Sequence, residues 1–299
     1  MTPKARAALA VMGAAVLFGT TGTTVALLAP DAPGAGVAAL RLLVGAAGLV
    51  AFIAWRTGWA SLTSLWRRPV VWGMGLAVAG YQAFFFIGTT RTGVAVAALI
   101  AMGSAPFLSG LLGWAMREGA PGWTWAASTT IGVTGLTLLV AGSLEGGDPW
   151  GMLAALAAGA CYAVFTVVGV GLAREGHGGG AVLAASFSVG AVLLIPAAFV
   201  STWWLTAGGI VAVLWLGLVT TTVAYLLFGV GLRYLQPGHI ATLTLLEPAV
   251  ATLLGVVVLG EPIGALGWMG CLLVFCALAL LGIAENRRDR SVVGQEAAS

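Results

Sequence analysis

The chain has 299 residues, of which 60% are hydrophobic and only 8% are charged, and its formal net charge is +3. Soluble globular proteins carry about 25% charged residues, so the composition excludes a water-facing surface and predicts an integral protein of the lipid bilayer. The small net charge gives no reason to expect nucleic acid as a partner.

Apolar segments follow one another along the chain, separated by charged or Gly/Pro-rich breaks. Since about 20 apolar residues cross the hydrocarbon core as a helix, each segment predicts one membrane span. In chain order, the ten segments cover residues 7–28, 37–55, 70–89, 94–116, 123–143, 150–173, 180–200, 208–230, 238–259 and 264–284. The polar tail, residues 285–299, is expected to be disordered and cytoplasmic.

The first segment follows Lys4 and Arg6 and looks like a secretory signal peptide. We expect it to stay in the protein, because it has a counterpart later in the chain. Small residues precede an aromatic residue both in VMGAAVLFGT, which ends at Thr20, and in AAGACYAVFT, which ends at Thr166.

Two prolines and two arginines indicate that the whole chain is duplicated. Fifteen positions separate Arg91 from Pro106, and the same fifteen separate Arg233 from Pro248. With the prolines aligned, the apolar sequences around them match without gaps. We therefore predict an all-α membrane protein of ten helices, built from two five-helix repeats, residues 1–145 and 146–284.

Because five is odd, the second repeat must enter the bilayer inverted, which is the plan of many secondary transporters. Loop charges agree with this plan. With the N-terminus inside, eleven Lys and Arg residues fall on the cytoplasmic side, Arg91 alone falls outside and Arg41 lies within a span. The positive-inside rule then predicts a multi-pass protein of the plasma membrane with both termini in the cytoplasm.

Glu247 lies nine residues after the start of its predicted span, beside Pro248 in the stretch TLLEPAVATLL. A charged side chain at the bilayer centre costs about 2.5–3.5 kcal/mol on insertion scales. We predict that Glu247 lines a central cavity and binds a substrate ammonium group or a proton. The alternative is a structural acid that fixes helix packing. Pro248 predicts a kink that frees a carbonyl group, and Pro106 is its counterpart in the first half.

Arg41 lies close to the outer end of the second segment and leaves two interpretations open. Its long side chain can snorkel outward to the membrane surface. It can also point inward and pair with Glu247 or with a substrate carboxylate.

Polar and aromatic residues in the predicted spans are further candidates for a cavity wall, because they supply hydrogen bonds and stacking surfaces. A buried amide such as Gln82 must find a partner, whereas each aromatic residue can equally belong to ordinary packing. The candidates are Tyr81, Gln82, Ser104, Tyr225, Tyr162 and Phe18.

The pattern resembles the EamA branch of the drug/metabolite transporter superfamily over nearly the whole chain. The resemblance is carried by Arg41 in AALRLLVGAAGL and by AALIAMGSAPFLSGLLGWAMRE and ATLTLLEPAVATLLGVVVLGE, each leading to a proline and then to an acidic residue after the helix. It implies ten helices in two repeats and a secondary carrier, often an exporter, of amino acids or related small metabolites. Ala105 departs from symmetry, because it stands where the second half has Glu247.

The sequence therefore predicts an alternating-access carrier for a small-molecule substrate, not an enzyme. It needs no cofactor, although proton coupling and a homodimer are both compatible with it. A passive facilitator or channel is the main rival, but channels usually arrange polar rings around a pore axis. An intramembrane enzyme needs a nucleophile with a base, or a metal cluster, and the spans contain neither pattern.

Overall fold

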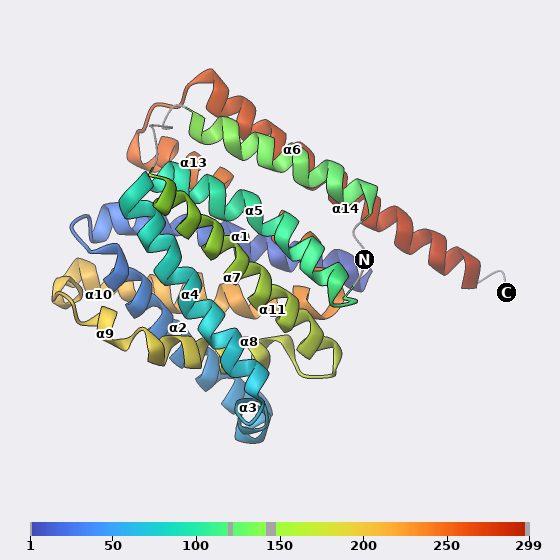
Figure 1. The fold of residues 1–299 in the computed structure, drawn as a ribbon, viewed down its shortest axis with the longest axis horizontal. Helices are drawn as coiled ribbons and strands as arrows, with labels where there is room; N and C mark the ends of the chain where they lie inside the picture. The colour runs from blue at the N-terminus through green and yellow to red at the C-terminus, as the bar shows by residue number, and fades with distance from the viewer. Residues whose placement is uncertain (1, 119–121, 142–147, 297–299) are drawn as a thin grey trace.

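The computed structural model describes residues 2–118, 122–141 and 148–296, with side chains described as far as residue 283. These ranges contain helices and the turns that join them, without β-strands (Figure 1). The predicted all-α class is therefore confirmed.

The first half of the chain forms α1 (Pro3–Leu28), α2 (Gly34–Thr57), α3 (Trp59–Trp66), α4 (Pro69–Thr92), α5 (Val94–Ala115) and α6 (Trp123–Val140). The second half forms α7 (Pro149–Arg174), α8 (Gly179–Leu193), α9 (Ile195–Ala198), η2 (Trp203–Leu205), α10 (Ala207–Leu214), η3 (Trp215–Val223), α11 (Ala224–Tyr234), α12 (Pro237–Leu243), α13 (Leu246–Leu259) and α14 (Ala265–Glu296).

Local sequence explains several helix ends. Pro3, Pro69, Pro149 and Pro237 each begin a helix, because the N–H that proline lacks has no partner in a first turn. Gly93 alone separates α4 from α5, and its φ of 83° is readily available only to glycine.

Eight helical stretches in the described part of the chain are long and apolar enough to cross a membrane. They coincide with eight of the ten predicted segments. The other two predictions fall on α6, which has 18 residues, and on α8, which has 15 residues and is followed by the short α9. The count of ten spans thus remains a prediction, as does the disordered tail, whose side chains lie outside the described residues.

Three predicted spans are less regular than expected. Segment 180–200 is divided between α8 and α9, and segment 238–259 is divided between α12 and α13. Segment 208–230 belongs to a longer stretch whose central part, η3, is a π-helix. The short helix α3, between the second and third predicted spans, was not predicted.

The helices of the two halves pack against each other in matching pairs. α1 packs on α11 and α13, while α7, the first helix of the second half, packs on α4 and α5. α2 packs on η3, and α8 correspondingly packs on α4. α6 and α14 run side by side along one edge of the bundle (Figure 1).

Close backbone approach explains the contact between α6 and α14. An added Cβ at Gly135 would lie 2.8 Å from the carbonyl oxygen of Gly270, and one at Gly270 would lie 2.6 Å from that of Gly135. Small residues allow such contact between apolar helices, where dispersion replaces the hydrophobic effect as the attraction.

Ion pairs at the helix ends show how α4 runs relative to α7. Arg91 at the end of α4 pairs with Asp148 before α7, at 3.2 Å, whereas Arg68 before α4 pairs with Glu175 after α7. The two helices are therefore antiparallel. Near their midpoints the two helices bring together three of the predicted site residues, Tyr81, Gln82 and Tyr162. Cys161, which was not predicted, lies beside them.

Candidate functional site

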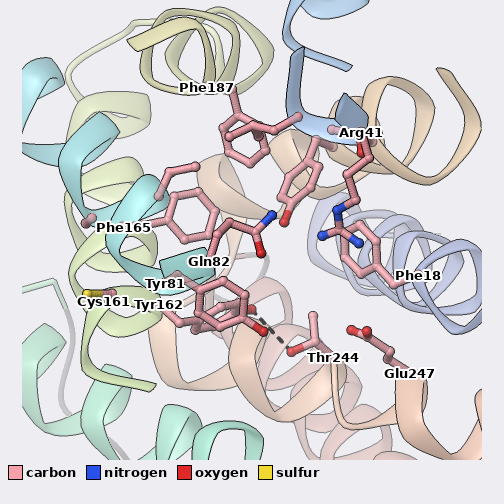
Figure 2. A pocket seen from close by; sticks show the side chains of 15 residues that line it. Phe18, Arg41, Tyr81, Gln82, Cys161, Tyr162, Phe165, Phe187, Thr244 and Glu247 are labelled. Carbon is pink, nitrogen blue, oxygen red and sulfur yellow. Dashed lines mark hydrogen bonds between the residues drawn. The ribbon is translucent and has the colours of Figure 1, made fainter. Parts of the chain in front are cut away.

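A cavity lies in the middle of the bundle, between helices from both halves of the chain (Figure 2). Its wall is formed by 15 residues. The candidates among them are Phe18, Arg41, Tyr81, Gln82, Tyr162, Tyr225 and Glu247. The structure thus brings seven of the eight predicted substrate-site residues together, although their role in binding remains a prediction.

Arg41 and Glu247 both face this cavity. Arg41 lies in the second turn of α2, and Figure 2 shows its guanidinium group pointing toward the carboxylate of Glu247. Arg41 thus points inward, whereas its pairing with Glu247 or with a substrate carboxylate stays a prediction. Among the described residues, the ion pairs closer than 4.0 Å do not include Arg41 with Glu247. The two side chains therefore line one cavity without a direct ion pair between them.

The break between α12 and α13 explains how Glu247 and Pro248 occur together inside an apolar segment. α13 begins at Leu246, so both residues lie in its first turn. A first turn tolerates proline, and the positive end of the helix dipole favours a carboxylate. The Thr244 carbonyl, which would face the missing N–H of Pro248, accepts a hydrogen bond from the Glu247 N–H at 3.0 Å instead. Pro106, by contrast, lies buried within the continuous helix α5.

Thr244 stands at the turn between α12 and α13 and lines the same cavity. Its hydroxyl donates to the Ala241 carbonyl at 2.9 Å and lies 3.2 Å from the Tyr162 hydroxyl. Because the Thr244 hydroxyl has one hydrogen, which Ala241 accepts, Tyr162 is the donor in the second bond. The pair therefore presents lone pairs, and no free hydrogen, to the cavity.

Gln82 and Tyr81 enter the cavity from α4. Figure 2 shows the Gln82 amide near the centre of the site, where it offers both donors and an acceptor. The Tyr81 ring stacks on Phe85 with centroids 5.8 Å apart and lies 6.3 Å from the ring of Tyr162. These contacts fix the ring that forms the wall beside Glu247.

Aromatic rings form much of the rest of the wall. The Tyr225 ring lies 5.0 Å from Phe18, 4.3 Å from Phe187 and 6.3 Å from Phe165. Phe165 and Phe187 were not among the predicted residues. Phe165 follows Tyr162 by three positions, a spacing that shares one helix face, so this signal was available. Phe187 carried no comparable signal.

A π-helical turn supplies another unpredicted wall residue, Thr221. Its hydroxyl donates to the Leu216 carbonyl at 2.8 Å, and the Thr222 hydroxyl donates to the Gly45 carbonyl of α2 at 3.0 Å. Thr221 thus satisfies a carbonyl of the irregular turn, and Thr222 joins that turn to α2. Short π-helical stretches are frequent at functional sites.

Ser104 is the predicted candidate that the structure places elsewhere. It is absent from the residues that line the cavity, and its hydroxyl donates to the Ala101 carbonyl at 3.3 Å. An added Cβ at Gly159 would lie 2.3 Å from the Ser104 hydroxyl oxygen, so the side chain packs against α7. Its neighbour Ala105 lies instead beside Glu247, in a side lobe of the site.

The cavity has room for water and for a small solute. The space open to the centres of water-sized molecules is about 60 Å³, and one water needs roughly 10–15 Å³ on this measure. Cationic, anionic, amide and hydroxyl groups all face this space. Such a site can replace the hydration shell of a polar molecule that carries both charges. Among the described residues, no group of three or more His, Cys, Asp or Glu side chains is placed to hold a metal ion.

Comparisons with known proteins agree with this architecture. The EamA-like transporter family matches the chain twice, over residues 5–141 and 149–283. The uncharacterized transporter YwfM of Bacillus subtilis is 34% identical over 94% of this chain and 95% of its own length. The threonine/homoserine exporter RhtA of Salmonella typhimurium is 30% identical over 81% of this chain and 78% of its own.

A solved crystal structure shares the fold, with a TM-score of 0.81 and 23% identity over 94% of this chain and 98% of that one. The two family matches together cover most of the sequence, and the relatives match along most of their lengths. The apolar helices identify a multi-pass membrane protein. The chain belongs to the EamA-like transporter family.

Proposed function

We propose that the protein is a secondary transporter that exports amino acids or related small metabolites by alternating access. The observation that carries this proposal is the placement of Arg41 and Glu247 around one cavity without an ion pair between them. The exporter RhtA, which is named for threonine and homoserine, supports the choice of amino acids as the substrate class.

The charges around the cavity fit a zwitterion. A guanidinium group binds a carboxylate through parallel N–H donors, so Arg41 takes the substrate carboxylate. An ionised carboxylate only accepts hydrogen bonds, so Glu247 takes the ammonium group. Gln82 and the aromatic rings of Tyr81, Phe18 and Tyr225 complete the enclosure. Binding both charges at once offsets the cost of removing the substrate from water.

The arrangement of the two halves supports alternating access. Each half supplies a first helix that packs on the third and fourth helical stretches of the other half, and the family matches each half separately. We propose ten spans in two inverted repeats, with both termini on the cytoplasmic side of the plasma membrane. Rocking of one repeat against the other would then expose the cavity to each side in turn.

We further propose that a proton drives export and that Glu247 carries it. A carboxylate inside a cavity can exchange an ammonium ligand for a proton, which couples the two fluxes. In this scheme a pH gradient drives substrate movement through the wild-type protein, and the Glu247→Gln variant no longer responds to the gradient.

Counterflow in proteoliposomes tests the proposed function. Vesicles loaded with an unlabelled amino acid should accumulate the same labelled amino acid through the wild-type protein. Glu247→Gln and Arg41→Gln should each lower exchange more than about ten-fold, because removing one partner of a desolvated charge pair costs about 2–5 kcal/mol. Glu261→Gln, at an exposed carboxylate after α13, is the matched control and should leave exchange unchanged.

Two outcomes would count against the proposal. No exchange of any amino acid over a broad panel, with folded protein in the vesicles, would exclude this substrate class. Rapid flux without acceleration by substrate on the opposite side would indicate a channel, because a carrier is accelerated by exchange whereas an open pore is not.

A further inference from the structure

The candidate site has a second, smaller lobe beside the main cavity. Four residues, Tyr81, Tyr162, Thr244 and Glu247, line both spaces and so form the wall between them. The lobe has about 30 Å³ open to the centres of water-sized molecules, against about 60 Å³ in the main cavity. It is therefore an extension large enough for a few heavy atoms.

The far end of this lobe is apolar. Beyond the shared wall it is lined by Ala101, Met102 and Ala105 of α5 and by Leu245. Ala101, Ala105 and Leu245 are each less than 7% exposed, so their positions are set by packing. Ala105 occupies the place that corresponds to Glu247 in the other half. At these corresponding positions the second half therefore has the carboxylate of Glu247 and the first half has only the methyl group of Ala105.

We propose that this lobe is the side-chain subsite and that Ala105 sets the length of side chain that it accepts. This inference rests on the proposed function, in which Glu247 and Arg41 hold the charged groups of an amino acid. With the ammonium group at Glu247, the α-carbon lies at the shared wall, and a side chain that leaves it can enter the apolar lobe. The lobe takes short, apolar chains, and its mouth can also accept a hydrogen bond.

The mouth of the lobe determines which polar groups enter. The Thr244 and Tyr162 hydroxyls have used their hydrogens on each other and on Ala241, so they offer only lone pairs. A side-chain hydroxyl near the α-carbon can donate to them. A side-chain carboxylate finds no donor on these two hydroxyls and lies beside Glu247, so acidic amino acids are disfavoured at this mouth.

A graded series of unbranched amino acids tests the size limit in proteoliposomes. Glycine, alanine, 2-aminobutyrate, norvaline and norleucine differ by single methylenes, and exchange through the wild type should fall sharply at one step. Ala105→Val should move that step to a shorter chain, and Ala105→Gly should move it to a longer one. One methylene is worth about ten-fold or more in such a pocket.

The control is Ala98→Val, which lies two turns before Ala105 on the same face of α5 and does not line the lobe. It should leave the length limit where the wild type has it. If both Ala105 variants exchange glycine normally and keep the wild-type limit, the subsite is wrong while the proposed function stands. If the wild type exchanges no member of the series, the proposed function itself fails. Should Ala105→Val not fold, Ala105→Gly alone decides the direction of the shift.

Discussion

The hydroxyl groups of Tyr162 and Thr244 lie 3.2 Å apart and join α7 to the turn between α12 and α13. Their hydrogen bond has a fixed direction, because the Thr244 hydroxyl donates to Ala241. It also ties the broken helix, which carries Glu247, to the aromatic wall. This single contact therefore couples the position of the deep carboxylate to the shape of the cavity.

Removing this hydrogen bond should have non-additive effects. Tyr162→Phe and Thr244→Val each delete one partner, and each should destabilise the folded protein by about 0.5–1.5 kcal/mol. Because both changes break the same bond, Tyr162→Phe should cost little further stability once Thr244 is already valine. Thermal unfolding of the purified variants in detergent measures this coupling.

Thr252→Val is the matched control for the threonine. The Thr252 hydroxyl donates to the Pro248 carbonyl within the same helix, at 2.9 Å, and in the described structure it forms no hydrogen bond with Tyr162. Its loss should leave the effect of Tyr162→Phe unchanged. Simple addition of the Tyr162 and Thr244 effects would show that the two hydroxyls do not depend on each other.

The contact between α2 and η3 should be intolerant of added volume. A Cβ at Gly45 would lie 2.3 Å from Cγ2 and 2.4 Å from Cβ of Thr221. Gly45→Ala should therefore destabilise the protein by about 1–3 kcal/mol through overpacking, and it should disturb Thr221 in the cavity wall. Gly22→Ala is the control, because nothing lies within 4 Å of its added Cβ. A Gly45→Ala variant as stable as Gly22→Ala would contradict the close packing.

Much of the site could be predicted because membrane burial makes polar residues informative. Glu247 and Arg41 were conspicuous in apolar segments, and both face the cavity. Gln82 was noticed for the same reason. The cost of burying such groups confines them to wet or paired positions, so their presence indicates either an internal cavity or a polar pair within the bundle.

The remaining features depend on contacts that a single sequence does not encode locally. Phe187 reaches the site because α8 packs against α11, and Ser104 misses it because α5 turns that side chain toward Gly159. A kink within one helix was predicted at Pro248, but the structure has two separate helices there, α12 and α13. Pro248 therefore lies in the first turn of α13 and does not interrupt a continuous helix. The π-helical η3 was likewise not predicted, since no motif in its sequence indicates it.

If the repeats are inverted, two equivalent positions in the two halves should lie on opposite sides of the membrane. Asp31 precedes α2 and Gly178 precedes α8, which are the second helices of their halves. In a variant without native cysteines, Asp31→Cys should react with an impermeant thiol reagent added outside intact cells. Gly178→Cys should react only after the membrane is opened. Reaction of both cysteines from the same side would exclude inverted repeats.

A cysteine at Gln82 should report directly on the cavity. Gln82 and Leu76 both lie on α4, but Gln82 lines the cavity whereas the Leu76 side chain is 63% exposed on the apolar outer surface. In the same cysteine-free background, a small charged methanethiosulfonate should modify Gln82→Cys and leave Leu76→Cys unmodified, because the reagent and the thiolate both require water. An amino acid that occupies the cavity should slow the first reaction in proportion to its occupancy. Equal reaction at both positions, or a rate at Gln82→Cys that no transported amino acid changes, would show that the substrate does not bind beside Gln82.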